Sequence, residues 1–173
     1  MVYTNIEGGC SCGHIRYKLH GKPFVVHCCH CSWCQRQTGA AFAVNALFES
    51  SNVELLKGKP KRLSMPSPSG NGQKIARCPK CEVAVWSNYF MGGIKEGIRF
   101  IRVGTLDNPE LLPPDIHIFT KSKQPWVVIP PNDKSVEVFY KYEDVWSNTD
   151  QKKRLNMLKQ TSKEPFDDQL TIE

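Results

Sequence analysis

The chain contains 173 residues, of which 40% are hydrophobic and 23% are charged, and its formal net charge is +6. This length allows one domain to bury its own core, and the composition excludes a largely disordered protein. No apolar run approaches the ~20 residues of a membrane-spanning helix and the first residues lack an export signal, so we expect a cytoplasmic protein with reduced cysteines.

Strand signals follow one another along the chain. Alternating residues, or runs of β-branched and aromatic ones, predict strands at 14–19, 24–28, 42–48, 83–90, 98–104 and 116–120. Glycine, proline and asparagine mark the turns between these segments. The sequence therefore predicts a mainly antiparallel β domain, with Trp86, Phe119 and Trp126 in its core.

Near the C-terminus the pattern changes to that of a helix at 149–160. Thr149 or Asp150 is the expected capping residue, because both side chains accept hydrogen bonds from free backbone amides. Leu155 and Leu158 fall on one face, so we expect this helix to pack against the sheet.

A second, shorter helix is predicted at 32–39, directly after a cluster of cysteines. The last residues, 162–173, show no periodicity and contain a proline, which is typical of a loosely held tail.

Positive charge is concentrated in three separate stretches, at 57–62, 121–123 and 152–154. These stretches lack the interleaved aromatic residues or the helical register of a nucleic-acid-binding face. We interpret them as solvated surface, which is also compatible with the attraction of a small anionic substrate.

The eight cysteines fall into three groups, and their short spacings are typical of metal ligands in a reducing compartment. The groups are Cys10 with Cys12, the quartet of Cys28, Cys29, Cys31 and Cys34, and Cys78 with Cys81. A pair of cysteines in a tight turn directs both sulfurs at one ion, and two such pairs complete a tetrahedral zinc site. Cys78 and Cys81 form one pair, while spacing alone leaves the other open between Cys10 with Cys12 and two members of the quartet.

If Cys10 and Cys12 complete that site, three cysteines remain for a second one, namely Cys29, Cys31 and Cys34. A closed zinc site with four protein ligands is structural, whereas three ligands with an exchangeable fourth position characterise a catalytic zinc. The alternatives are a second structural zinc with a further protein ligand and a reactive thiol cluster without metal.

Several residues near this second site have more than one interpretation. Cys28 adjoins Cys29, and neighbours on an extended chain face opposite sides, so we leave Cys28 out of the site. His27 and His30 are either partners of the metal ligands or polar residues near the surface, and either of them, or Cys28, would close a second structural site. His30 and His117 are candidate proton donors, although a strand histidine beside apolar neighbours is more often a hydrogen-bonded core residue.

Four blocks of sequence together resemble the glutathione-dependent formaldehyde-activating enzyme family, which includes centromere protein V. They are GGCSCGHIRY, CHCSWCQRQTGAAF, CPKC followed by VW, and DIHIFTKSKQPW. The resemblance implies a zinc-binding domain over 3–130, built from stacked, twisted antiparallel β-sheets with two zinc ions. Residues 131–161 are then an extension packed on this domain.

The resemblance also implies roles for the cysteines. The structural zinc ligands of the family are matched by Cys10, Cys12, Cys78 and Cys81, and those of the catalytic zinc by Cys29, Cys31 and Cys34. The implied activity joins the sulfur of glutathione to formaldehyde, giving S-(hydroxymethyl)glutathione. Three thiolates leave a charge of about −1 on the catalytic ion, which favours a thiol over water as its fourth ligand.

Two features depart from the family pattern. The family usually has glycine after the second cysteine pair, where this chain has Glu82, and Cys28 is an additional thiol. If the position of Glu82 requires a positive φ, glutamate costs about 1 kcal/mol more than glycine there. Two other functions stay open, because a shared fold does not fix the reaction: a zinc lyase or dehydratase acting on a different small electrophile, and a non-enzymatic zinc-stabilised interaction domain.

Overall fold

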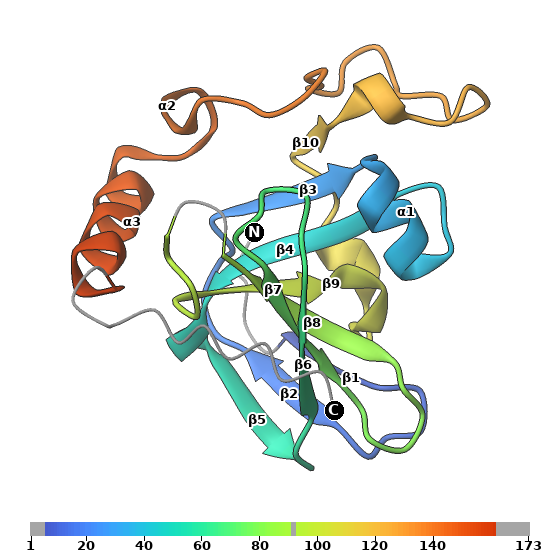
Figure 1. Cartoon of the computed structure of the whole chain (residues 1–173), viewed down its shortest axis with the longest axis vertical. Helices are drawn as coiled ribbons and strands as arrows, with labels where there is room; N and C mark the ends of the chain where they lie inside the picture. Colours follow the sequence, from blue (N-terminus) through green and yellow to red (C-terminus); the bar gives the residue numbers. More distant parts are fainter. Residues whose placement is uncertain (1–5, 91–92, 162–173) are drawn as a thin grey trace.

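Two β-sheets form the body of the protein in the computed structural model, which describes residues 6–90 and 93–161 (Figure 1). The smaller sheet has the strand order β1-β2-β5, and the larger has the order β10-β3-β4-β9-β8-β7-β6. The strands are β1 (Ile6–Gly9), β2 (Arg16–Leu19), β3 (Val25–Cys29), β4 (Ala43–Glu49), β5 (Val53–Lys57), β6 (Lys61–Met65), β7 (Gln73–Arg77), β8 (Ala84–Tyr89), β9 (Ile98–Arg102) and β10 (Ile116–Ile118). Neighbouring strands are antiparallel except β3 and β10, which are parallel. The prediction of a mainly antiparallel β domain is confirmed.

All six predicted strands are present, as β2, β3, β4, β8, β9 and β10, but four further strands were not predicted. Two of these, β5 and β6, are edge strands whose side chains are exposed along almost their whole length. An edge strand accepts charged side chains on both faces, so it lacks the alternation by which strands are recognised. The basic stretch 57–62 runs from the end of β5 through the connection to the start of β6, and its charged side chains are exposed, as expected for a solvated surface.

The larger sheet is buried on both faces, because successive side chains of its central strands point alternately into two cores. One core lies between the two sheets and includes Tyr17 and Phe48. The other lies on the opposite face and includes Leu47 and Trp146. Leu47 and Phe48 are neighbours on β4, so a single strand supplies both cores.

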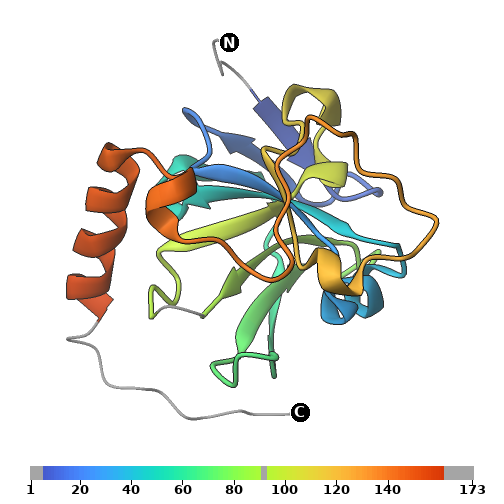
Figure 2. The same cartoon turned by 90° about the horizontal axis from the view of Figure 1, so that it is seen from above.

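Three helices accompany the sheets, together with four short 3-10 turns at Ser50–Asn52, Val103–Thr105, Pro109–Leu111 and Thr120–Ser122. The predicted short helix is α1 (Ser32–Thr38), which ends at Gly39 with a left-handed φ of 67°. Helix α2 (Tyr142–Val145) leads into α3 (Asn148–Thr161), and Figure 2 shows α3 beside the larger sheet. In the described part of the chain, none of the helices has both the length and the apolar composition that a membrane crossing requires.

The start of α3 differs from the prediction in its capping residue. Ser147 is the cap, because its hydroxyl accepts a hydrogen bond from the backbone N–H of Asp150 at 3.2 Å and donates one to the Asp150 carboxylate at 2.6 Å. This reciprocal pair satisfies an amide that the first turn leaves free. Leu158 packs against the second core as expected, whereas Leu155 is 51% exposed, so only one of the two leucines faces the sheet.

Of the three aromatic residues predicted in the core, Trp86 is buried and Phe119 is half-buried against the second core. The prediction was wrong for Trp126, which is 72% exposed. Trp126 follows Pro125 in a segment without strand or helix, so no regular element carries its side chain inward. Residues 162–173, where a loose tail was predicted, lie outside the described residues, and the division into a 3–130 domain and a 131–161 extension stays a prediction.

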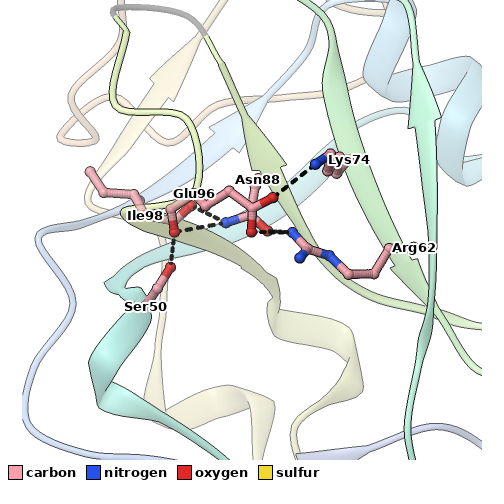
Figure 3. Close-up of polar contacts among 6 residues, drawn as sticks. All are labelled: Ser50, Arg62, Lys74, Asn88, Glu96 and Ile98. Atoms are coloured by element: carbon pink, nitrogen blue, oxygen red, sulfur yellow. Dashed lines mark hydrogen bonds and ion pairs between the residues drawn. The ribbon is translucent and has the colours of Figure 1, made fainter. Parts of the chain in front are cut away.

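A polar network anchors the connection between β8 and β9 (Figure 3). Asn88 donates hydrogen bonds from its side-chain amide to the carbonyl oxygens of Glu96 and Ile98, at 3.3 and 2.9 Å. The Glu96 carboxylate forms ion pairs with Arg62 of β6 and Lys74 of β7, the latter at 3.1 Å. The network therefore ties this connection to the sheet.

Replacement of Asn88, which is buried, removes both of its hydrogen bonds to the connection. Asn88→Ala is expected to lower the free energy of unfolding by about 2 kcal/mol, measured by urea denaturation. Asn132→Ala, at an exposed position, is the control and should change the same free energy by less than about 0.5 kcal/mol. Equal stabilities of the two variants would contradict an anchoring role for Asn88.

Glu96 makes the strength of this network depend on pH. Burial raises the pKa of Glu96, but hydrogen bonds from Arg62 and Lys74 outweigh burial and bring this pKa below its ordinary value of 4.5. A carboxylate with a lowered pKa stabilises the fold above its unfolded-state pKa, and this stabilisation is lost as the pH falls through the folded-state value. At pH 7, Glu96→Gln is expected to lower the free energy of unfolding by no more than about 1 kcal/mol, because solvent partly screens the ion pairs of Glu96 with Arg62 and Lys74. In urea titrations the difference should shrink as the pH falls below 4.5 and disappear once Glu96 is protonated in the folded state, and a constant difference would contradict this assignment.

Candidate metal centres and the adjacent pocket

Four cysteines meet at the tips of two hairpins that belong to different sheets. The sulfur atoms of Cys10, Cys12, Cys78 and Cys81 all lie within 4.8 Å of one another. The Sγ atom of Cys12 is 3.5 Å from that of Cys10 and 3.7 Å from that of Cys78. Sulfurs on a tetrahedral zinc are separated by about 3.8 Å, since each Zn–S bond is about 2.3 Å long. The donor set and its spacing therefore fit a closed zinc site.

The two hairpin turns share one backbone geometry. The amide of Cys10 donates to the carbonyl of Ile15, and that of Cys78 donates to the carbonyl of Val83. The residue after the second cysteine is left-handed in both turns, with φ of 67° at Gly13 and 60° at Glu82. Glu82 therefore occupies a position that favours glycine, as the sequence comparison with the family pattern suggested.

Glu82 and its neighbours hold this strained turn in place. The Glu82 carboxylate forms an ion pair with Lys61 on β6 at 2.6 Å, and the backbone carbonyl of Glu82 accepts a hydrogen bond from the Arg77 side chain at 2.8 Å. Both contacts stabilise the conformation of the second turn. The electrostatics of the first turn favour a thiolate, because hydrogen bonds from the Ile15 amide and neighbouring thiols outweigh burial and lower the pKa of Cys10 to about 6.

Three other cysteines meet at the C-terminal end of β3. Cys29 is the last residue of the strand, Cys31 is the N-cap of α1, and Cys34 lies in the first turn of that helix. Their sulfur atoms lie within 4.8 Å of one another. Hydrogen bonds from Cys29 and Cys34 lower the pKa of Cys31 to about 3, and the same interactions raise the pKa of Cys29. The cluster therefore concentrates negative charge on Cys31, as a cation site requires.

The loop that carries this cluster is fixed by hydrogen bonds to the segment after β10. The backbone amide of His30 donates to the carbonyl of Ile118 at 3.0 Å. The carbonyl of His30 accepts from the side chains of Gln35 and Ser122, at 2.7 and 3.1 Å. These contacts fix the start of α1 relative to β3 and thereby the relative positions of the three sulfurs.

A pocket opens beside the three-cysteine cluster, on the face of the larger sheet opposite the smaller one. Its walls are mainly aromatic and aliphatic, and all three cysteines line it. The residues that line it are His27, Cys29, Cys31, Trp33, Cys34, Gln37, Asn45, Leu47, Pro68, Gln73, Ser87, Tyr89, Ile94, Ile98, Phe100, Arg102, Ile118, Phe119, Phe139, Tyr140, Tyr142 and Trp146. None of the four cysteines at the hairpin tips is among the described residues that line this pocket, so the pocket adjoins the three-cysteine cluster.

Two polar groups of the pocket wall lie next to the cysteine cluster. The Arg102 guanidinium donates a hydrogen bond to the Asn45 side-chain oxygen at 2.6 Å. Burial lowers the pKa of Arg102, and negative charge on Cys34 opposes this effect. An arginine stays protonated in proteins, so Arg102 brings a positive charge to the thiolates. His27 contacts the Tyr140 hydroxyl at 2.7 Å, and burial lowers its pKa to about 3, which keeps the imidazole neutral.

A third group of candidate ligands lies on the other face of β3. Cys28, His30 and His117 bring their ligand atoms within 4.8 Å, and His117 pairs with Asp133 at 3.5 Å. The Nε2 atom of His30 is 2.9 Å from Nδ1 of His117, which is a hydrogen-bond distance. Nitrogens on a tetrahedral zinc are about 3.3 Å apart, so this group fits a hydrogen-bonded chain better than a zinc site.

The sequence predictions for these residues have different outcomes. The Cys10–Cys12 and Cys78–Cys81 pairs do meet, and Cys28 does face away from Cys29. His27 and His30 are buried, so their interpretation as polar residues near the surface was wrong. His30 and His117, considered as proton donors, do not line the pocket. The reason is the strand alternation, which directs residues 28 and 30 away from the face that carries Cys29.

Some pocket residues were missed in the sequence, chiefly Arg102 and the aromatic side chains near the C-terminus. Arg102 lies in a segment whose sequence predicts only a strand of the core, and no neighbouring residue indicates a functional role for it. The aromatic side chains gave a signal that was not used, since four of them fall within the eight residues 139–146.

The fold and the cysteine clusters define the class of protein: a β-sheet protein in which four sulfurs meet at two hairpin tips and three other sulfurs meet beside a pocket. A family model described as glutathione-dependent formaldehyde-activating enzyme matches residues 5–122, and the chain belongs to this family. No curated protein matches the chain. A crystal structure of a protein from Rhodobacter sphaeroides is similar, with 18% identity and a TM-score of 0.45, covering 58% of this chain and 87% of that one.

The separation of the two faces of β3 yields a test with two adjacent thiols. Cys29→Ala removes a sulfur from the pocket cluster and should lower the zinc content of the purified protein by about one ion per chain. Cys28→Ala is the matched control and should leave the zinc content unchanged, because its sulfur lies on the other face. Elemental analysis of both variants measures the effect, and equal zinc losses would contradict the separation.

Proposed function

We propose that the protein is a zinc-dependent carbon–sulfur lyase that joins glutathione, or a related small thiol, to formaldehyde or a related electrophile, in the reducing cytoplasm. We assign Cys10, Cys12, Cys78 and Cys81 to a structural zinc and Cys29, Cys31 and Cys34 to a catalytic zinc. The observation that carries the proposal is the difference between the clusters: three sulfurs adjoin a pocket, and four meet away from it. Family membership supports the same assignment.

The reaction proposed for this site needs no oxidant or reductant. Cys29, Cys31 and Cys34 would hold a zinc ion, which would supply an exchangeable fourth position where a thiol has a lowered pKa. A carbon–sulfur bond forms as the π bond of the carbonyl group breaks, and the proton released by the thiol ends on the oxygen. The product of glutathione and formaldehyde is then S-(hydroxymethyl)glutathione.

The protein's own residues contribute position and charge to this reaction. The His30 carbonyl, held by Gln35 and Ser122, fixes the loop between the ligands. Arg102 lines the pocket beside the cluster, where its positive charge would stabilise the oxygen as it becomes negative. The apolar walls exclude water, which strengthens the interaction between Arg102 and the negative oxygen.

Substitution of one ligand in each cluster tests the proposal. Cys31→Ser should keep the fold and lower the rate of thiol addition at least about 100-fold. Loss of a residue that only hydrogen-bonds to a metal ligand costs up to about 100-fold in activity, and loss of the ligand itself should cost more. Cys78→Ser should instead unfold the protein, because a structural zinc contributes folding free energy directly. The rate is followed by NMR with ¹³C-labelled formaldehyde and glutathione, and the fold by circular dichroism.

Equal destabilisation by the two substitutions would contradict the division into structural and catalytic sites. A well-folded protein that holds two zinc ions per chain but accelerates thiol addition to neither formaldehyde nor a larger aldehyde would contradict the enzymatic assignment. That result would favour a zinc-stabilised interaction domain.

A further inference from the structure

The pocket beside Cys29, Cys31 and Cys34 has a chemical character that the family match does not account for. The match ends at residue 122, whereas one wall of the pocket is built from residues 139–146. This wall presents the side chains of Phe139, Tyr140, Tyr142 and Trp146. A segment outside the matched region therefore determines which molecules can approach the three sulfurs.

This aromatic wall is rigidly packed. Phe139 and Tyr140 stack with ring centroids 4.4 Å apart, and Trp146 meets Tyr142 edge to face at 5.3 Å. The Trp146 indole donates to the Tyr140 hydroxyl at 2.8 Å, and the Arg154 guanidinium lies 3.8 Å from the Tyr142 ring centroid. Contacts of this kind fix the ring positions before any ligand arrives, which lowers the entropy lost on binding.

Another part of the pocket lining is also apolar and is held in place from outside the pocket. Ile94, from the connection between β8 and β9, and Ile98, the first residue of β9, both line the pocket. That connection is the one anchored by Asn88 and Glu96 (Figure 3). Phe100 extends the same part of the lining along β9. A ligand in the pocket is thus surrounded by aromatic and aliphatic side chains.

Charge in the pocket argues against a zwitterionic occupant. Among the described residues that line it there is no aspartate, glutamate or lysine, and Arg102 is the one side chain with a permanent charge. Glutathione carries an ammonium group and two carboxylates. No carboxylate of the pocket wall matches the ammonium group, and a single arginine does not match two carboxylates, so the charged ends of a glutathione whose sulfur reaches the cluster would lie outside this space. The walls suit an apolar molecule instead.

Two buried donors indicate that this molecule carries an oxygen. The indole Nε1 of Trp33 and the amide Nε2 of Gln73 have no hydrogen-bond partner within the described parts of the chain, and both residues line the pocket. Gln73 is 4% exposed. Unpaired buried donors destabilise a protein, and a turn of either side chain toward an acceptor oxygen of a ligand would relieve that cost. A carbonyl group meets this requirement and adds no charge.

We propose that the pocket selects an aromatic aldehyde as the electrophile, with its ring against the wall formed by residues 139–146 and its carbonyl group toward the cysteine cluster. This inference rests on the proposed thiol-adding function and replaces formaldehyde by a ring-bearing substrate. The addition is balanced as before: the thiol sulfur bonds to the aldehyde carbon, the carbonyl π bond breaks, and the thiol proton ends on the oxygen.

Binding of an unreactive mimic tests the pocket separately from the chemistry. Benzamide keeps the ring and the carbonyl oxygen, and acetamide keeps only the carbonyl group. We expect benzamide to bind the zinc-loaded full chain at least tenfold more tightly than acetamide, measured by NMR chemical-shift titration. Phe139→Leu, which removes a ring but keeps an apolar side chain, should weaken benzamide binding at least threefold. Trp126→Ala is the control, since Trp126 is exposed and lies outside the pocket.

Turnover separates failure of this proposal from failure of the proposed function. The rates of thiol addition to benzaldehyde and formaldehyde are compared at equal concentrations, and benzaldehyde is expected to react at least tenfold faster. Equal binding of benzamide and acetamide, with formaldehyde turned over, would overturn the aromatic selectivity and leave the lyase function intact. Ring-dependent binding that Phe139→Leu weakens, with neither aldehyde turned over, would support the pocket's selectivity and overturn the lyase.

Discussion

The alternation of side chains along β3 is the constraint on which the site depends. This strand is buried along its whole length, so each successive residue must suit one of two different interiors. Cys29 belongs to the face that carries the pocket, and Cys28 belongs to the face that carries His30 and His117. A one-residue change in register would exchange the two thiols and place the wrong chemistry at the pocket.

The two sulfur clusters owe their difference to the elements that carry them. In the closed cluster, two hairpin turns of the same geometry each contribute two sulfurs, which exhausts the four positions of a tetrahedral ion. In the open cluster, a strand end and a helix start contribute three sulfurs from one short segment, 29–34. The pocket beside these sulfurs has walls that are supplied by distant parts of the chain.

The sequence was informative wherever a feature is local. Cysteine spacing and turn residues predicted the pair Cys78 and Cys81, because a tight turn determines where its own sulfurs point, whereas the division into two clusters came from the family resemblance. Alternation predicted the central strands but not β5 or β6, whose exposed edge positions remove the signal. Trp126 was placed in the core on its residue type alone, although a side chain reaches a core only when an element directs it there. The pocket was not predicted, because its walls meet through tertiary contacts between residues far apart in the sequence, such as His27 and Tyr140, which are 113 positions apart.

The hairpin-tip cluster also has a consequence for how the chain is assembled. Cys12 and Cys78 are 66 positions apart, and they belong to different sheets. An ion bound there closes a long loop, whose entropic cost rises only slowly with its length. It would act as a reversible cross-link, restricting the unfolded chain much as a disulfide bond does while forming and breaking with metal supply. The joining of the two sheets would then follow the availability of zinc during folding, and the N-terminal hairpin would dock late, after β7 and β8 have been synthesised.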